Sequence, residues 1–268
     1  MPHTCIKVDI QDEIATLTLN RPEKLNSLNF TILREMALAI RELNEDEGVK
    51  VLIMTGEGRA FCTGADLSSG DNITDKNRPG LSRAEHLMPF VTLGRAIIEM
   101  EKFNKPIIAA VNGLAVGAGL AYALAADIRF ASDKARFSAI FIRRGLVPDT
   151  GASYLLTRLV GVSRALEMMW TGEMISAPEA ERIGMVNHVV PHDQLMQATR
   201  EFALKLARGP SLAIEMVKRM AYTALKADSL VTQMTIEDQM QHVAYESQDV
   251  QEGVKSFLEK RPPDFKGM

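Results

Sequence analysis

The sequence predicts an α/β protein in which strands and helices alternate along the chain. Two patterns lead to this fold class: apolar or alternating runs of four to seven residues, typical of strands, and longer segments whose apolar residues recur at helical spacing. Beyond residue 190 only helical patterns follow. We therefore expect a strand-and-helix core over residues 1–190 and a helical C-terminal region over residues 191–268.

Each element is assigned from its local pattern. Strands are expected at residues 14–19, 49–55, 107–111 and 128–131. Helices are expected at residues 31–43, 119–125, 154–160, 195–207, 211–227 and 248–260. Ser176, followed three residues later by Glu179, forms a capping box that starts one more short helix. Residues 68–80 contain too few apolar residues to pack firmly, which predicts a mobile loop.

The composition excludes several classes of protein. With 268 residues and 46% hydrophobic content, the chain is long enough to bury a substantial core. A net charge of −3 argues against a nucleic-acid surface, which needs clustered basic residues. No run requires a membrane span and no secretory pattern opens the sequence, so we expect a cytoplasmic protein. The five histidines show no metal-ligand spacing, so no metal is expected.

Three small residues in a row, Gly117, Ala118 and Gly119, stand where a strand-like run gives way to a helical one. A ligand can approach the backbone there, and N–H groups at a helix start can point at a developing negative charge. Residues 61–67 form a second turn of small residues, and the two turns together can donate to one oxygen. Glycines at such junctions also serve tight packing alone, so that alternative stays open. A dinucleotide fingerprint is not completed, because Tyr122 stands where its third glycine belongs.

The two turns belong to a set of motifs that covers nearly the whole chain. In order, the motifs occupy residues 19–28, 61–67, 105–113, 126–129 and 252–262. Together they resemble the crotonase family, the enoyl-CoA hydratase/isomerase superfamily. The resemblance implies a spiral of repeated ββα units with a C-terminal helical trimerisation region, and acyl-CoA thioesters as substrates. It also implies that the backbone N–H groups of Ala65 and Ala118 form an oxyanion hole for the thioester oxygen.

The resemblance also implies where coenzyme A lies, as a part of the substrate and not as a separate cofactor. Contacts within one chain are expected from Lys24, Leu25, Gly64, Asp66, Leu67 and Gly117. Phe257 and Lys260 correspond to C-terminal residues that touch the coenzyme A of a neighbouring subunit. The implied assembly is a homotrimer or hexamer, in which residues 191–268 serve oligomerisation and cover coenzyme A. An ordinary solvated side chain is the alternative for each lysine.

Acidic residues decide which reaction such a hole can support. Residues 102–166 contain no glutamate, and their only acids are Asp127, Asp133 and Asp149. Hydratases of the family carry two glutamates in this region, at positions that correspond here to Ala121 and Phe141. Water addition by the usual pair of carboxylates therefore has no residues to carry it.

Asp149 is the remaining candidate acid or base. From its local sequence alone it is a helix N-cap, since a helical pattern follows at residue 154. By resemblance it matches the single aspartate of phenylacetyl-CoA-pathway isomerases and 4-chlorobenzoyl-CoA dehalogenases, whereas Asp127 and Asp133 match structural positions. The dehalogenase pattern also requires a tryptophan near Phe141 and a histidine near Gly94, and both are missing. The isomerases are therefore favoured.

The resulting expectation is an enoyl-CoA isomerase. Asp149 moves a proton between two carbons while the hole holds the enolate oxygen. An apolar lining from Leu120, Phe141 and Leu146 strengthens the base by desolvation, unless these three side chains simply belong to the core. Two alternatives stay open: a weak hydratase that uses Asp149 and an ordered water, and a non-catalytic member that only binds acyl-CoA.

Overall fold

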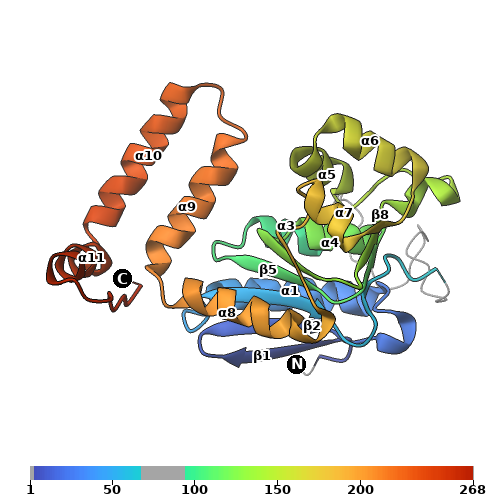
Figure 1. The fold of residues 1–268 in the computed structure, drawn as a ribbon, viewed down its shortest axis with the longest axis horizontal. Helices are drawn as coiled ribbons and strands as arrows, with labels where there is room; N and C mark the ends of the chain where they lie inside the picture. Colours follow the sequence, from blue (N-terminus) through green and yellow to red (C-terminus); the bar gives the residue numbers. More distant parts are fainter. Residues whose placement is uncertain (1–2, 68–93, 268) are drawn as a thin grey trace, which may run out of the picture.

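The computed structural model describes residues 3–67 and 94–267 of the chain. The loop expected at residues 68–80 lies outside these residues. The described part forms two β-sheets with helices around them, followed by a long helical extension at the C-terminus (Figure 1). No helix in the described ranges is both long and apolar enough to cross a membrane.

The larger sheet has six strands in the spatial order β1-β2-β3-β5-β7-β10. Their bounds are β1 Ile6–Gln11, β2 Ile14–Leu19, β3 Val51–Gly56, β5 Ile107–Val111, β7 Ile128–Ser132 and β10 His188–Val190. The first two strands form an antiparallel hairpin, and every other neighbouring pair in this sheet is parallel. The four strands expected from the sequence all lie in this sheet, within two residues of their predicted bounds.

The smaller sheet has the order β4-β6-β8-β9, with β4 Ala60–Cys62, β6 Leu114–Val116, β8 Arg136–Ser138 and β9 Ile175–Ser176. Strands β4, β6 and β8 each follow closely after a strand of the larger sheet and pair in parallel with one another. Helix α4 (Ala118–Leu124) follows β6, and helix α5 (Ala152–Val160) follows β8. The chain thus repeats a ββα unit that adds one strand to each sheet per turn, and the predicted spiral is confirmed.

Helices cover both faces of the larger sheet. On one face, α1 (Phe30–Glu45), α3 (Arg95–Glu101) and α4 enclose the main core. Helix α1 starts at Asn29, whose side chain accepts a hydrogen bond from the Ile32 N–H at 3.0 Å. On the other face, α8 (Leu195–Ala207) packs on β2, β3, β5 and β7 and buries a second apolar cluster.

Two further helices lie between α5 and α8 in the chain: α6 (Val162–Thr171) before β9, and α7 (Ala177–Arg182) after it. The capping position predicted for α7 is confirmed, because the Ser176 hydroxyl accepts a hydrogen bond from the Glu179 N–H at 3.4 Å. The reciprocal half of the capping box is not formed. The Glu179 carboxylate pairs with Arg182 at 2.7 Å instead.

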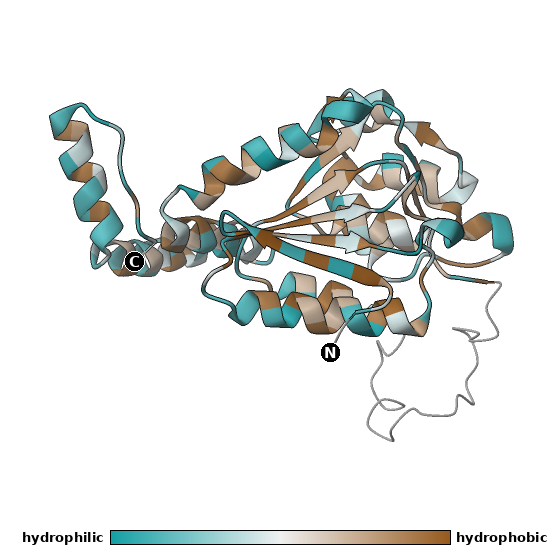
Figure 2. Ribbon diagram, turned by 90° about the horizontal axis from the view of Figure 1, so that it is seen from below, coloured by the Kyte–Doolittle hydropathy of each residue, from teal (hydrophilic) through white to brown (hydrophobic). Residues whose placement is uncertain are grey.

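Three helices form a C-terminal arm that stands away from the sheets (Figures 1 and 2). They are α9 (Ser211–Ala224), α10 (Leu230–Tyr245) and α11 (Gln248–Glu259). Because α8 packs on the larger sheet, the departure from the core begins with α9 and not at residue 191, where the sequence pattern changes. Several apolar side chains of the arm are exposed, with Phe257 at 83% and Leu258 at 73%.

Asp127 ties the arm to the core, which agrees with the structural role expected of it. Its carboxylate accepts hydrogen bonds from the Ile107 N–H at 2.7 Å and the Tyr222 hydroxyl at 2.8 Å, and it pairs with Lys218 at 2.7 Å. Lys218 also donates to the Lys105 carbonyl at 2.8 Å. Burial lowers the pKa of Lys218, and it raises the pKa of Tyr222. This network joins the start of β5 to α9.

Candidate active site

The two turns of small residues lie side by side at the C-terminal ends of strands β4 and β6 in the smaller sheet. Strands β4 and β6 are parallel neighbours, so the turns that follow them leave the sheet side by side. Gly64 has a φ of +84°, and a Cβ on it would lie 2.9 Å from the Val116 carbonyl oxygen and 3.2 Å from the Ala118 nitrogen. A glycine is therefore needed at this position for both conformation and space. Gly64 therefore packs directly against Val116 and Ala118, which brings the two turns together as the sequence analysis expected.

The Ala118 N–H is the first of helix α4. Gly117 precedes it with a φ of +58°, and its own N–H donates to the Ser138 carbonyl at 2.9 Å. The Leu120 and Ala121 N–H groups donate to the Gly117 carbonyl. No residue in the described ranges accepts from the Ala118 N–H. Because the first N–H groups of a helix have no partner within it, this donor remains free for a ligand.

The Ala65 N–H is the second such donor. Ala65 pairs with Leu28 in an isolated parallel bridge, in which the Leu28 N–H donates to the Gly64 carbonyl and the Asp66 N–H donates to the Leu28 carbonyl. Successive peptide groups of an extended chain point to opposite sides, so the Ala65 N–H points away from Leu28. Within the described part of the chain it has no acceptor. We refer to the Ala65 and Ala118 N–H groups together as the hole.

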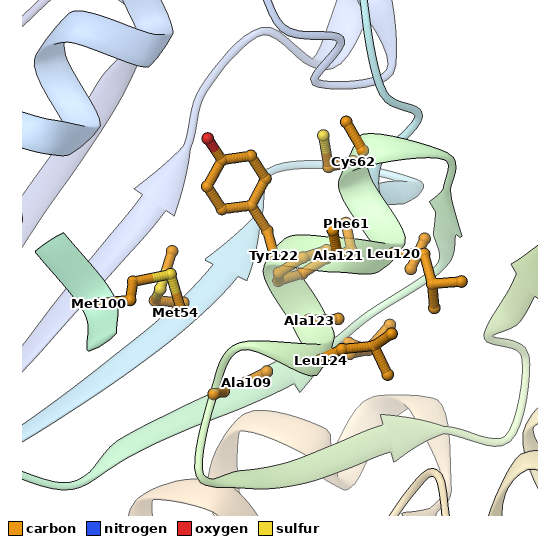
Figure 3. Close-up of a cluster of buried hydrophobic side chains, with 14 of the residues drawn as sticks. Met54, Phe61, Cys62, Met100, Ala109, Leu120, Ala121, Tyr122, Ala123 and Leu124 are labelled. Atoms are coloured by element: carbon orange, nitrogen blue, oxygen red, sulfur yellow. The ribbon is translucent and has the colours of Figure 1, made fainter. Parts of the chain in front are cut away.

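Gly119 has a different role from Gly64. A Cβ on Gly119 would collide with the Cys62 carbonyl, which means that close packing of α4 on β4 requires a residue without a side chain here. This is the packing role that remained open in the sequence analysis. Figure 3 shows Cys62 beside the start of α4, with Tyr122 and Leu120 projecting from different sides of the helix. Burial raises the pKa of the Cys62 thiol to about 12, which fits an inert buried residue.

The motif at residues 19–28 braces the second turn. Asn26 is fully buried, and its amide donates to the Ala60 carbonyl at 2.7 Å and to the Glu57 carbonyl at 3.0 Å. Its side-chain oxygen accepts from the Arg21 N–H at 2.9 Å. The sequence analysis did not identify Asn26 as a site residue. The signal is structural: Leu25 and Asn26 form a pair of left-handed residues, a conformation that the sequence does not reveal and that specific contacts hold.

Residues proposed for coenzyme A contact are distributed around the same turn. Lys24 ends a 3₁₀ helix, η1 (Pro22–Lys24), and the carbonyl of the next residue, Leu25, accepts a hydrogen bond from the Thr63 hydroxyl at 3.2 Å. This bond joins Leu25 to the turn that carries the Ala65 N–H. Leu67 is the last residue of this turn, and 61% of it is exposed.

The structure gives Asp66 a supporting role. Its carboxylate is buried and pairs with Arg21 at 3.0 Å, and its N–H is engaged by the Leu28 carbonyl. The Asp66 side chain thus fixes the turn from inside, and the coenzyme A contact expected from the backbone of this turn stays a prediction. The physical reason is that a buried carboxylate needs a cationic partner, which Arg21 supplies.

Asp149 lies in an exposed loop between the 3₁₀ helix η2 (Ile140–Arg144) and α5. We call residues 145–151 the carboxylate loop. The N-cap of α5 is Gly151 and receives no side-chain hydrogen bond, so Asp149 does not cap this helix as its local sequence suggests. Its carboxylate accepts a hydrogen bond from the Thr150 hydroxyl at 2.7 Å.

The carboxylate loop is adjacent to the helix that begins at the hole. Helices α4 and α5 pack against each other. The pKa of Tyr122, which projects from α4, is raised mainly by burial and in addition by the nearby groups Cys62 and Asp149. Helix α5, which directly follows the carboxylate loop, thus packs against the helix that carries the Ala118 N–H at its start.

The positions at which hydratases carry glutamates by resemblance hold buried apolar side chains. Ala121 is fully buried and Phe141 is 6% exposed, and both belong to the main core together with Leu120. Of the three residues expected to line Asp149, only Leu146 reaches the surface, where 50% of it is exposed. Helix α4 and η2 turn the Leu120 and Phe141 side chains into the core, which is the alternative that the sequence analysis left open. Their role in lining Asp149 stays a prediction.

Phe257 and Lys260 do not approach the site within one chain. Both lie at the end of α11 in the arm, and Figure 1 shows this helix far from α4. Their expected contact with coenzyme A in a neighbouring subunit stays a prediction.

Comparison with known proteins defines the class and then the family. A structure of a putative enoyl-CoA hydratase from Streptomyces coelicolor A3(2) superimposes with a TM-score of 0.91 at 35% identity, over 100% of this chain and 96% of that one. The ββα spiral is thus the crotonase fold. Residues 9–268 match the family described as enoyl-CoA hydratase/isomerase. The chain belongs to this family, which acts on acyl-CoA thioesters.

Two curated relatives illustrate the range of the family. A probable enoyl-CoA hydratase of Mycobacterium tuberculosis (strain ATCC 25618 / H37Rv) is 40% identical over 258 residues, which cover 94% of this chain and 89% of the relative. The 1,2-epoxyphenylacetyl-CoA isomerase of Escherichia coli (strain K12) is 36% identical over 262 residues, covering 96% and 97%. The chain is therefore about equally similar to a protein named as a hydratase and to one named as an isomerase.

Proposed function

We propose that this protein isomerises enoyl-CoA thioesters by moving a proton between two carbons of the acyl chain. In this proposal the Ala65 and Ala118 N–H groups bind the thioester oxygen, and Asp149 is the sole acid and base. The observation that carries it is the combination of two free backbone donors with buried, apolar residues at positions 121 and 141. A hole without the glutamate pair is suited to enolate chemistry at a single carboxylate.

In this proposal, the hole supplies most of the stabilisation of the enolate-like transition state. Removal of a proton from the carbon next to the thioester carbonyl places negative charge on the carbonyl oxygen. Removal of a proton from the far side of a conjugated double bond has the same effect. Fixed N–H donors stabilise that charge as it forms, and one such donor contributes about 3 kcal/mol to the transition state. Because both donors belong to the backbone, they need no reorganisation during the reaction.

Asp149 transfers the proton. Its carboxylate accepts the proton from one allylic carbon and returns it to the carbon two bonds away, which shifts the double bond into conjugation. A single carboxylate is sufficient, because the proton leaves and returns on the same face of the substrate. No second acid is required.

Coenzyme A enters as part of the substrate in this proposal. Lys24, Leu25, Gly64, Leu67 and Gly117 surround the hole and supply its contacts within the chain. The exposed apolar residues of the arm support assembly into a homotrimer or hexamer, in which Phe257 and Lys260 approach the coenzyme A of a neighbouring subunit.

The experiment that tests the proposal is incubation of the purified protein with a 3-enoyl-CoA in deuterated buffer. We expect the conjugated 2-enoyl thioester to form, and its formation to depend on Asp149. In parallel, a 2-enoyl-CoA is offered as substrate, since a relative named as a probable hydratase is 40% identical. Accumulation of 3-hydroxyacyl-CoA supports a weak hydratase instead. Binding of acyl-CoA with neither reaction supports a non-catalytic family member.

A further inference from the structure

Thr150 has a backbone conformation that its residue type disfavours. Its φ is +55°, and Gly151 follows with a φ of +77°. Glycine adopts this left-handed region freely, whereas a β-branched side chain there is an outlier. Such outliers persist only where the surrounding structure holds them, and they concentrate at functional sites. Thr150 is 9% exposed, while Asp149 before it and Gly151 after it are exposed.

The left-handed turn directs the Thr150 hydroxyl back onto the preceding residue. Oγ1 of Thr150 donates to Oδ1 of Asp149 at 2.7 Å. A hydrogen bond from a hydroxyl to a carboxylate at this distance is charge-assisted and therefore stronger than one between neutral groups. In the part of the chain that the structure describes, no group donates to Oδ2 of Asp149. One carboxylate oxygen is thus held and the other is free.

We propose that Thr150 is the positioning residue of the active site, fixing the Asp149 carboxylate so that Oδ2 faces the substrate. This inference rests on the proposed role of Asp149 as acid and base. The carboxylate is on an exposed loop, where its side-chain torsions are otherwise unrestrained. A bond from a buried hydroxyl removes this freedom before the substrate arrives. Proton transfer between two carbons requires such restraint, because the same oxygen has to reach both.

Two substitutions distinguish the role of the Thr150 hydroxyl from that of the left-handed backbone. Thr150→Val keeps the size and β-branching of the side chain and removes only the donor. Thr150→Gly also removes the donor, but it relieves the left-handed backbone, so this variant folds even where valine does not. Thr150→Ser retains the donor. Thr157→Val is the matched control, since Thr157 lies on α5 and, among the residues that the structure describes, its hydroxyl bonds only to the backbone carbonyls of residues 153 and 154.

The test measures kcat and KM for isomerisation of a 3-enoyl-CoA. We expect kcat to fall roughly 10- to 100-fold in Thr150→Val and Thr150→Gly, because a small misplacement of a reacting group has effects of this size, with little change in KM. Thr150→Ser and Thr157→Val retain kcat. The melting temperature of Thr150→Gly stays at or above that of the wild type while its kcat falls, which a purely structural role does not produce.

Further outcomes distinguish this inference from the proposed function. Combining Thr150→Val with Asp149→Asn lowers kcat no further than Asp149→Asn alone, because Thr150 acts through Asp149. Wild-type kcat in Thr150→Gly, or equal losses in the serine and valine variants, overturns the positioning role. If kcat is lost in Asp149→Asn but not in Thr150→Gly, only this inference fails. If Asp149→Asn itself is fully active, the proposed function fails.

Discussion

The hole and the carboxylate loop differ in how firmly the fold holds them. The hole consists of backbone N–H groups in turns that follow buried strands, and Gly64, Gly117 and Ala118 are buried. The carboxylate loop is exposed over most of its length, and its one acidic side chain has a single hydrogen-bonding partner. In the proposed function, charge stabilisation therefore depends on the fold, whereas proton transfer depends on one side chain. A family with a common fold can change its reaction through such side chains alone.

The largest effect tests the side-chain half of this comparison. Asp149→Asn preserves the size of the side chain and removes its ability to accept a proton. We expect the isomerisation rate to fall roughly 10²- to 10⁴-fold, the usual contribution of a general base, while the affinity for a saturated acyl-CoA is unchanged. The rate is followed by the absorbance of the conjugated thioester and the affinity by calorimetry. Asp133→Asn, at an exposed acid of the same region, is the matched control and retains full activity.

The next prediction tests the backbone half. Gly64→Ala places a Cβ against Val116 and Ala118 and strains a residue whose φ is +84°. Displacement of the hole lowers kcat by roughly 10²- to 10³-fold, the cost of losing one oxyanion donor. Gly161→Ala provides the control, since Gly161 also has a positive φ but a Cβ there meets nothing within 4 Å. If both alanine variants show the same kcat, backbone strain in general and not the hole is responsible.

A smaller effect is expected from the brace behind the hole. Asn26→Ala removes three hydrogen bonds: those to the Ala60 and Glu57 carbonyls and the one from the Arg21 N–H. Of the side-chain hydrogen bonds to the Ala60 carbonyl among the described residues, only the longer one remains, from the Asn112 amide at 3.3 Å. Each buried group left unpaired costs about 1–3 kcal/mol, so the free energy of unfolding falls by about 2–4 kcal/mol. Urea denaturation measures this change. An Asn26→Ala variant as stable as the wild type would show that the motif at residues 19–28 does not brace the turn.

The smallest effect concerns Cys62, which adjoins the hole without taking part. Its pKa of about 12 keeps the thiol protonated at every pH below that value, and it is fully buried. Iodoacetamide at pH 8 is therefore expected to modify Cys62 only after the protein is unfolded, because the thiolate is the reactive species. Mass spectrometry of the alkylated peptides measures this. Rapid modification of the native protein would mean that the packing around β4 opens.

The sequence alone predicted the elements that have a clear apolar periodicity. Residues 31–43 repeat at helical spacing, and α1 spans Phe30–Glu45. The strands of the larger sheet that were predicted have five or six residues, enough for a recognisable apolar pattern. The strands of the smaller sheet have two or three residues. No periodicity exists over such a length, so β4, β6 and β8 were not predicted. Helix α10 is long but was also missed, because its apolar residues do not gather on one face and none of its residues is buried. The helices α3 and α6 and the strand β1 were missed as well.

The candidate site shows the same division. Small residues at 64, 117 and 119 and the missing glutamates at 121 and 141 are read directly from the sequence. The sequence could not separate the glycine that brings the two turns together, Gly64, from the one that only permits packing, Gly119, because the difference depends on which backbone atoms lie opposite each Cα. For Asp149, local sequence favoured a helix cap, and the left-handed turn at Thr150 gives its carboxylate a different partner.

The sequence by itself determined the family, the α/β class and the single aspartate, because these depend on residue identity and order along the chain. Only the tertiary structure decided that the Ala65 and Ala118 N–H groups are free, that Asp66 supports the turn, and that Thr150 holds Asp149. The physical reason is that hydrogen-bond satisfaction is a property of pairs of groups. Whether an N–H is free depends on what the fold places opposite it, and residues far apart in the sequence supply that.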